Sequence, residues 1–164
     1  MEKRYVVAQG IRVPTFIYGT AWKEQNTERL TRMALTAGFT GIDTANQRRH
    51  YVEADVGAAL KNGFQEGTLN RSELFIQTKF TSIDGQDHRL PYDPSAPVTK
   101  QVAQSFQSSL EHLGIDAIDS YVLHGPSHRM GLTQIDWEVW KAMEMLQRAG
   151  KTRLLGVSNI ALEQ

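Results

Sequence analysis

The stretch GIDTANQRRHYVEADVGAAL, residues 41–60, passes from a short apolar run into a predicted amphipathic helix, which we expect to end at Gly63. Units of this kind recur along the chain, because short runs with strand character alternate with helical segments. The strand candidates are residues 15–20, 39–44, 73–80, 117–124 and 153–159, and the helix candidates are 27–38, 53–63, 98–113 and 133–149. Parallel strands need a crossover helix between them, so the alternation predicts a parallel sheet, either doubly wound or a (β/α) barrel.

Local sequence signals predict which residues are buried in two of these elements and where a third begins. The helix over 27–38 is expected to bury one stripe, made of Leu30, Met33, Ala34 and Ala37. The run ELFIQTKF, residues 73–80, is typical of a strand buried on both faces. Thr133 and Asp136 have the spacing of a capping box. The long loop over 81–97 is rich in turn residues, which predicts a segment that is functional or poorly ordered.

Composition excludes several classes of protein. The 164 residues, 40% hydrophobic and 22% charged, predict one globular domain over 1–164. Eighteen basic residues balance eighteen acidic ones without a basic run, so we expect no nucleic-acid partner. The absence of cysteine excludes disulfides, thiolate nucleophiles and zinc–cysteine sites. No window approaches the roughly 18 apolar residues of a membrane span, and the first residues lack a signal-peptide core. We therefore expect a cytoplasmic protein.

Chemically capable side chains lie at the carboxyl ends of the predicted strands. They are Asp43, Lys79, His124, Ser158 and Asn159. In both candidate folds these ends share one edge of the sheet, where ligands bind. Each residue also has a purely structural explanation: a turn cap, a snorkelling lysine, a satisfied histidine, or helix caps. Their coincidence on one edge favours a site, because a buried lysine and aspartate need each other as partners.

Tyr51 gives this cluster a chemical use. A lysine ammonium beside a tyrosine is expected to lower the pKa of the phenol from about 10, which makes Tyr51 a usable proton donor. Such a donor suits the reduction of a carbonyl group, whose oxygen must be protonated as hydride reaches the carbon. Asp43 would hold Lys79, and His124 would bind the carbonyl oxygen. The hydride must come from a cofactor.

Five segments of the chain resemble the aldo-keto reductase family, in the family's order. They are IRVPTFIYGTAWK (11–23), the stretch from GIDTA to EADVGAAL (41–60), LFIQTKF (74–80), SLEHLGIDAIDSYVLHGP (109–126) and GKTRLLGVSN (150–159). The resemblance implies a (β/α)₈ barrel of the TIM type, opened by a small hairpin. It also implies reduction of aldehydes or ketones with NADPH, without metal or flavin.

The resemblance also implies a role for individual residues. Catalysis falls on Asp43, Tyr51, Lys79 and His124; cofactor contacts fall on Gly19, Thr20, Asp43, Ser158 and Asn159; and Trp22 is expected to line the substrate pocket. The segment DTANQRRHY carries extra residues between the acid and the tyrosine, so His50 and Arg48 are alternatives for the tyrosine's position. We prefer Tyr51, with His50 as the second candidate.

The length of the chain leads to further expectations. A barrel of this type needs about 250 residues, whereas this sequence ends after its fifth strand. We expect an incomplete barrel, either a fragment of a longer protein or a truncated product, and in both cases a chain that can be inactive by itself. We prefer the fragment, whose unpaired edges could associate with another copy. Two other functions stay open. One is a non-catalytic binding or structural subunit of the same family, and the other is an aldolase that uses Lys79 as a Schiff-base nucleophile.

Overall fold

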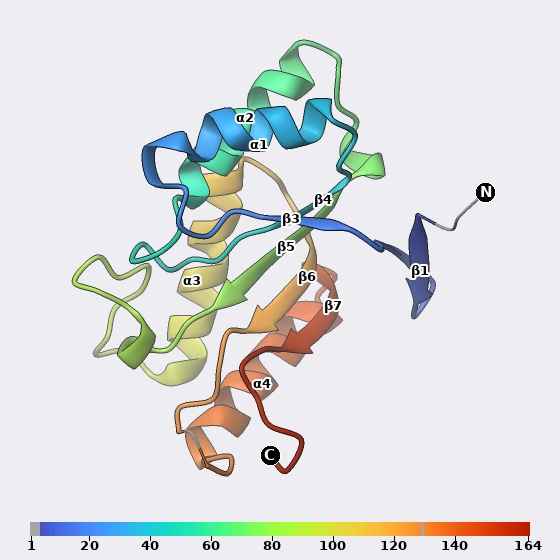
Figure 1. The fold of residues 1–164 in the computed structure, drawn as a ribbon. Helices are drawn as coiled ribbons and strands as arrows, with labels where there is room; N and C mark the ends of the chain where they lie inside the picture. Colours follow the sequence, from blue (N-terminus) through green and yellow to red (C-terminus); the bar gives the residue numbers. More distant parts are fainter. Residues whose placement is uncertain (1–3, 129) are drawn as a thin grey trace.

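The computed structural model describes residues 4–128 and 130–164. It begins with an antiparallel hairpin of β1 (Tyr5–Ala8) and β2 (Ile11–Pro14). Gln9 and Gly10 connect the two strands, and both have positive φ, 50° and 78°. This backbone is typical of two-residue hairpin loops. The hairpin lies beyond the amino-terminal ends of the main strands, opposite their arrowheads (Figure 1).

The main sheet and its helices follow in regular alternation. Five parallel strands form the sheet in chain order: β3 (Ile17–Gly19), β4 (Gly41–Asp43), β5 (Phe75–Phe80), β6 (Ile118–Leu123) and β7 (Thr152–Val157). The α-helices are α1 (Thr27–Thr36), α2 (Glu53–Gln65), α3 (Val98–Leu113) and α4 (Gln134–Arg148). Short 3-10 turns are η1 (Glu24–Asn26), η2 (Arg71–Glu73) and η3 (Ile83–Gly85).

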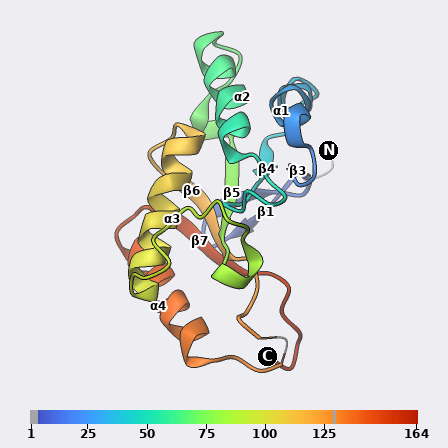
Figure 2. The same ribbon diagram turned by 90° about the vertical axis from the view of Figure 1, so that its left-hand side faces the viewer.

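The order of the strands distinguishes between the two candidate folds. A doubly wound sheet reverses its strand order and carries helices on both faces, whereas a barrel keeps chain order with all helices outside. Here the order is sequential, and α1 to α4 pack side by side in chain order. Figure 2 shows the helices in an arc outside the strands. The fold is therefore part of a (β/α) barrel, and residues 4–128 and 130–164 contain five of its parallel strands.

The two faces of the sheet differ in chemistry. On β5, Ile76 and Phe80 are 0% and 1% exposed and belong to the core beneath the helices. Gln77 and Lys79 alternate with them and lie on the other face. The main cluster of buried apolar side chains therefore lies between the sheet and the helices, and polar side chains occupy the inner face of the partial barrel. No helix within the described ranges is both long and apolar enough to span a membrane.

The predicted ends of α3 and α4 are confirmed, but the predicted end of α2 is wrong, because the helix continues past Gly63 to Gln65. The predicted buried face of α1 is also wrong. Thr133 and Asp136 form the capping box, and Gly114 and Gly150 end their helices with positive φ. On α1, Met33 is 56% exposed, and the buried residues are Thr27, Thr31, Ala34 and Leu35. The buried face includes two threonines, which hydrophobic periodicity does not count. Thr27 is accommodated because its hydroxyl donates to the Glu24 carbonyl.

Gly57 allows α2 to pack directly against the backbone of α3. A Cβ at this position would lie 1.9 Å from the backbone oxygen of His112. We predict that Gly57→Ala destabilises the chain by about 1–3 kcal/mol through overpacking, although alanine is normally the better helix former. Urea unfolding of the variant measures this. Lys61→Ala, at an exposed position of the same helix, is the control and should change little. An unchanged or higher stability of Gly57→Ala would contradict the prediction.

Candidate active site

One row of paired residues crosses all five strands, at the carboxyl ends of β3 and β4 and through the middle of β5, β6 and β7. The strand pairing aligns Gly19 with Asp43, Asp43 with Gln77, Gln77 with Ser120 and Ser120 with Leu154. The three polar side chains of this row form a chain of hydrogen bonds. The Ser120 hydroxyl donates to Gln77 Oε1 at 2.9 Å, and Gln77 Nε2 donates to Asp43 Oδ1 at 2.8 Å. The acid is therefore oriented from within the sheet.

Lys79 forms a buried ion pair with Asp43. Its Nζ lies 2.6 and 2.7 Å from the two carboxylate oxygens and 2.8 Å from the Thr44 carbonyl. The side chains are 7% and 23% exposed. An ammonium group has three donors, and these contacts use all of them. The expected pairing of Asp43 with Lys79 is present.

The extra residues before Tyr51 form a turn. The backbone N–H groups of His50 and Tyr51 both donate to the Gln47 carbonyl, at 3.2 and 3.0 Å. Behind this turn, the Tyr51 ring centroid lies 5.1 Å from Lys79 Nζ and 5.8 Å from the His124 ring centroid. The Arg48 side chain is exposed, and its one hydrogen bond among the described residues goes to the Tyr51 carbonyl, at 3.5 Å. The structure therefore brings Tyr51 together with Asp43, Lys79 and His124.

The expected acidification of Tyr51 is wrong for this structure. Burial raises the pKa of the phenol, and the Asp43 carboxylate raises it further. The physical reason lies in the ion pair, since Lys79 is matched by Asp43 and little net positive charge remains beside the ring. Tyr51 is therefore a protonated phenol at neutral pH.

His124 follows the end of β6 and is held through its ring. Its Nδ1 lies 2.7 Å from the Thr81 hydroxyl. Burial, and then the charge of Lys79, lowers the pKa of His124 to about 4. The imidazole is therefore neutral at neutral pH and can donate only one hydrogen bond.

Trp22 and His50 form an exposed aromatic pair at the same end of the sheet. Their ring centroids are 3.8 Å apart, and the backbone N–H of Trp22 donates to the His50 carbonyl at 2.8 Å. Trp22 is 68% exposed and has a φ of 61°. Because the turn over Gln47 carries His50, the pair places Trp22 at the edge of the site, where its substrate role remains a prediction.

The residues expected to contact the cofactor occupy the ends of β3 and β7. A Cβ on Gly19 would meet no atom within 4 Å, so this position is open. Thr20 is fully buried, and its hydroxyl donates to the Asp43 carbonyl at 2.9 Å. Thr20 therefore ties β3 to β4. Its role in cofactor binding stays a prediction.

Ser158 and Asn159 offer the groups that a carboxamide needs. Asn159 Nδ2 donates to the His124 carbonyl at 2.6 Å and to the Ser158 hydroxyl at 3.1 Å. The Ser158 proton and Asn159 Oδ1 make no hydrogen bond within the described part of the chain. One can donate and the other accept, which complements the carbonyl and NH₂ of a nicotinamide carboxamide. These residues therefore fit the expected cofactor.

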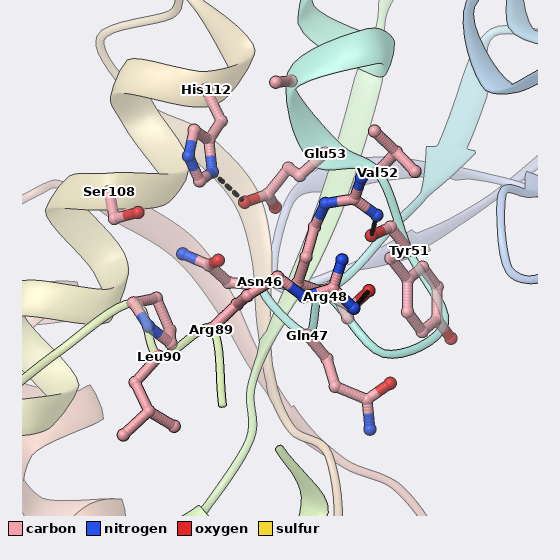
Figure 3. A pocket seen from close by; sticks show the side chains of 13 residues that line it. Asn46, Gln47, Arg48, Tyr51, Val52, Glu53, Arg89, Leu90, Ser108 and His112 are labelled. Carbon is pink, nitrogen blue, oxygen red and sulfur yellow. Dashed lines mark hydrogen bonds and ion pairs between the residues drawn. The ribbon is translucent and has the colours of Figure 1, made fainter. Parts of the chain in front are cut away.

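Two cavities adjoin the cluster. One of about 420 Å³ is lined by side chains that include His124, His50 and Asn159. The other, of about 360 Å³, has Tyr51 on one wall and the Glu53–His112 pair on another, with Arg48 beside Tyr51 (Figure 3). Among residues 4–128 and 130–164, no three His, Cys, Asp or Glu side chains are grouped as a metal site requires.

Sequence reasoning did not identify Gln77, Ser120 or Thr81. Gln77 and Thr81 precede and follow Lys79 by two residues, and in a strand this spacing places Gln77 on the face of Lys79. A polar residue inside the apolar run LFIQTKF is therefore the signal that could have found Gln77. No comparable signal marks Ser120 or Thr81, because their roles depend on contacts between strands.

The ion pair predicts unequal effects of its two substitutions. Asp43→Asn leaves the Lys79 ammonium buried without a counter-ion, which costs about 3–5 kcal/mol for pairs of this kind. Lys79→Met is expected to cost less, because Asp43 is 23% exposed and keeps the Gln77 amide. Urea unfolding of both variants shows which substitution lowers the free energy of unfolding more. A greater loss of stability in Lys79→Met would show that Lys79, rather than its partner, is the critical member.

The Glu53–His112 contact predicts a pH dependence. His112 Nδ1 lies 3.3 Å from Glu53 Oε2, and this hydrogen bond raises the pKa of His112. The stabilisation is fully present below the unfolded pKa near 6.5 and is lost as pH rises through the folded pKa. His112 is 42% exposed, so we expect an effect below about 1 kcal/mol. Urea unfolding of the wild type and His112→Gln at pH 5 and pH 9 measures the effect. An equal loss of unfolding free energy at both pH values would contradict the prediction.

Comparison with known proteins places this site in a family. The model of the Aldo/keto reductase family matches residues 15–164. The oxidoreductase YtbE of Bacillus subtilis is 29% identical over 99% of the chain and 52% of its own length. The methylglyoxal reductase DkgA of Escherichia coli is 34% identical over 86% of the chain and 44% of its own length.

A solved structure of an aldo-keto reductase also matches the fold of this chain. The Bombyx mori aldo-keto reductase AKR2E4, crystallised in complex with NADP, superposes with a TM-score of 0.71 at 27% identity, covering 90% of this chain and 47% of its own. The chain spans about half the length of the proteins that it matches. The sequence match and the shared fold together show that the chain belongs to the aldo/keto reductase family.

Proposed function

We propose that this chain carries the catalytic cluster of an NADPH-dependent reductase of aldehydes or ketones, with Tyr51 as the proton donor. The observation that carries the proposal is the convergence of Asp43, Lys79, Tyr51 and His124 at one end of the sheet. Family membership as an oxidoreductase supports it, and so does the NADP complex of the silkworm relative. The relative named methylglyoxal reductase supports a small carbonyl compound as the substrate class.

Each residue has a separate task in this reaction. A bound NADPH, its carboxamide held by Ser158 and Asn159, would supply the hydride to the carbonyl carbon. Tyr51 gives its phenolic proton to the carbonyl oxygen as negative charge develops there. The phenolate that remains is stabilised by the Lys79 ammonium, whose Nζ lies 5.1 Å from the ring centroid. Asp43 keeps that ammonium in place, and His124 donates a hydrogen bond to the carbonyl oxygen.

The structure weighs against the Schiff-base alternative. A lysine nucleophile must present a free amine, whereas Lys79 is buried and all three of its donors are used. The binding-subunit alternative stays open, because a phenol whose pKa is raised by burial gives up its proton less readily. NADPH binding without turnover of any aldehyde would establish that alternative.

The identity of the proton donor can be tested directly. We predict that Tyr51→Phe lowers kcat/KM for aldehyde reduction by about 10²–10⁴-fold, the usual range for loss of a general acid. NADPH binding, followed by quenching of tryptophan fluorescence, should persist. His50→Gln is the matched control and should lower kcat/KM far less. A loss that falls on His50→Gln instead would assign the proton donor to His50.

The raised pKa of Tyr51 predicts the alkaline limit of the reaction. The phenol must be protonated to act as a donor, and its pKa lies above the usual value of about 10. We expect kcat/KM for reduction to show no alkaline decline between pH 7 and about 10. A decline centred well below pH 10 that is absent in Tyr51→Phe would show that the working phenol is acidified after all.

A further inference from the structure

The backbone that carries His124 is fixed on both sides. Its N–H donates to the Phe80 carbonyl at 2.9 Å, and its carbonyl accepts from Asn159 Nδ2 at 2.6 Å. The imidazole can therefore vary only in its side-chain rotation and in which nitrogen carries the proton. Both are controlled by what the ring touches.

Thr81 is the residue that holds the ring. It follows the end of β5, is 5% exposed, and its hydroxyl lies 2.7 Å from His124 Nδ1. The loop over 81–97 fixes Thr81 in turn. Its carbonyl accepts hydrogen bonds from the Tyr92 hydroxyl at 2.9 Å and from Gln86 Nε2 at 3.2 Å. The position of the Thr81 hydroxyl beside the ring is therefore fixed by hydrogen bonds within its own loop.

The hydrogen-bond inventory sets the direction of this contact. A hydroxyl has one proton to donate, and among the described residues His124 Nδ1 is the only partner of the Thr81 hydroxyl. If Nδ1 were protonated, the buried threonine proton would be left without an acceptor, which is costly. The favoured arrangement has Thr81 donating to Nδ1. A neutral ring then carries its proton on Nε2.

We propose that Thr81 is a positioning residue that fixes His124 in the tautomer protonated at Nε2. The consequence concerns the carbonyl substrate. Nε2 has no hydrogen-bond partner in the described part of the chain, and the ring lines the cavity of about 420 Å³. With the proton on Nε2, His124 is a donor toward that cavity, whereas the other tautomer would present a lone pair that repels a carbonyl oxygen. This consequence rests on the proposed reductase function, but the tautomer does not.

The tautomer is measured by long-range nitrogen–proton NMR on the chain labelled with ¹⁵N-histidine at pH 7. The chain has five histidines, and a His124→Gln variant assigns the signal of interest. We expect the wild type and Thr81→Ser to show a proton on Nε2. Thr81→Val, which keeps the shape but removes the hydroxyl, should shift the ring toward the Nδ1-protonated form. Ser82→Ala, next to it in the loop, is the control and should match the wild type.

Two outcomes overturn the proposal. One is a wild-type ring protonated on Nδ1, and the other is a Thr81→Val ring with the same tautomer as the wild type. If Thr81→Val does not fold, the wild-type and Thr81→Ser spectra still show which nitrogen of His124 carries the proton.

A kinetic experiment tests the consequence for the reaction. The kcat/KM for aldehyde reduction should fall about tenfold in Thr81→Val and recover in Thr81→Ser. The expected tautomers without turnover in any variant would contradict the reductase function and leave the role of Thr81 intact.

Discussion

The ion pair between Lys79 and Asp43 is the constraint around which this end of the sheet is arranged. Removing two charges from water is costly, and the cost is offset only when each charge finds well-placed partners. The ammonium meets both carboxylate oxygens and the Thr44 carbonyl, and the carboxylate also accepts from the Gln77 amide. These partners come from β4, β5 and the loop that follows β4. The pair therefore fixes the relative positions of adjacent strands where the candidate site lies.

The same pairing decides the electrostatics around Tyr51. A lone ammonium would acidify the phenol, but an ammonium matched by a carboxylate leaves burial as the dominant influence, so the pKa rises. A protonated phenol is the form that a reductase needs before the reaction. The ammonium becomes useful only afterwards, when the phenolate forms beside it. Lys79 and Asp43 can thus serve stability in the resting protein and charge stabilisation in the reaction without any rearrangement.

The sequence predicted the architecture well because strand–helix alternation and strand ends depend on local signals. Asp43 and Lys79 were predicted to meet on the basis of parallel neighbouring strands, and they do. The exposed Met33 shows the limit of periodicity, because the helix buries Thr27 and Thr31 instead, and the Thr27 hydroxyl is satisfied by a local hydrogen bond. The pKa of Tyr51 was wrongly predicted because a pairwise argument considered Lys79 without its counter-ion. Thr81 was missed because its partner lies 43 positions away in the sequence.

Asn159 joins the two halves of the candidate site. Its φ of 52° is one that asparagine adopts more readily than most residues, and it allows the side chain to turn back toward β6. There its amide donates to the His124 carbonyl, while its own oxygen stays available to a ligand. The residue expected to hold the cofactor's carboxamide thus also holds the backbone of the residue expected to orient the carbonyl. Because Thr81 fixes the ring of His124 and Asn159 fixes its backbone, the segments that follow β5 and β7 together determine where that imidazole can donate.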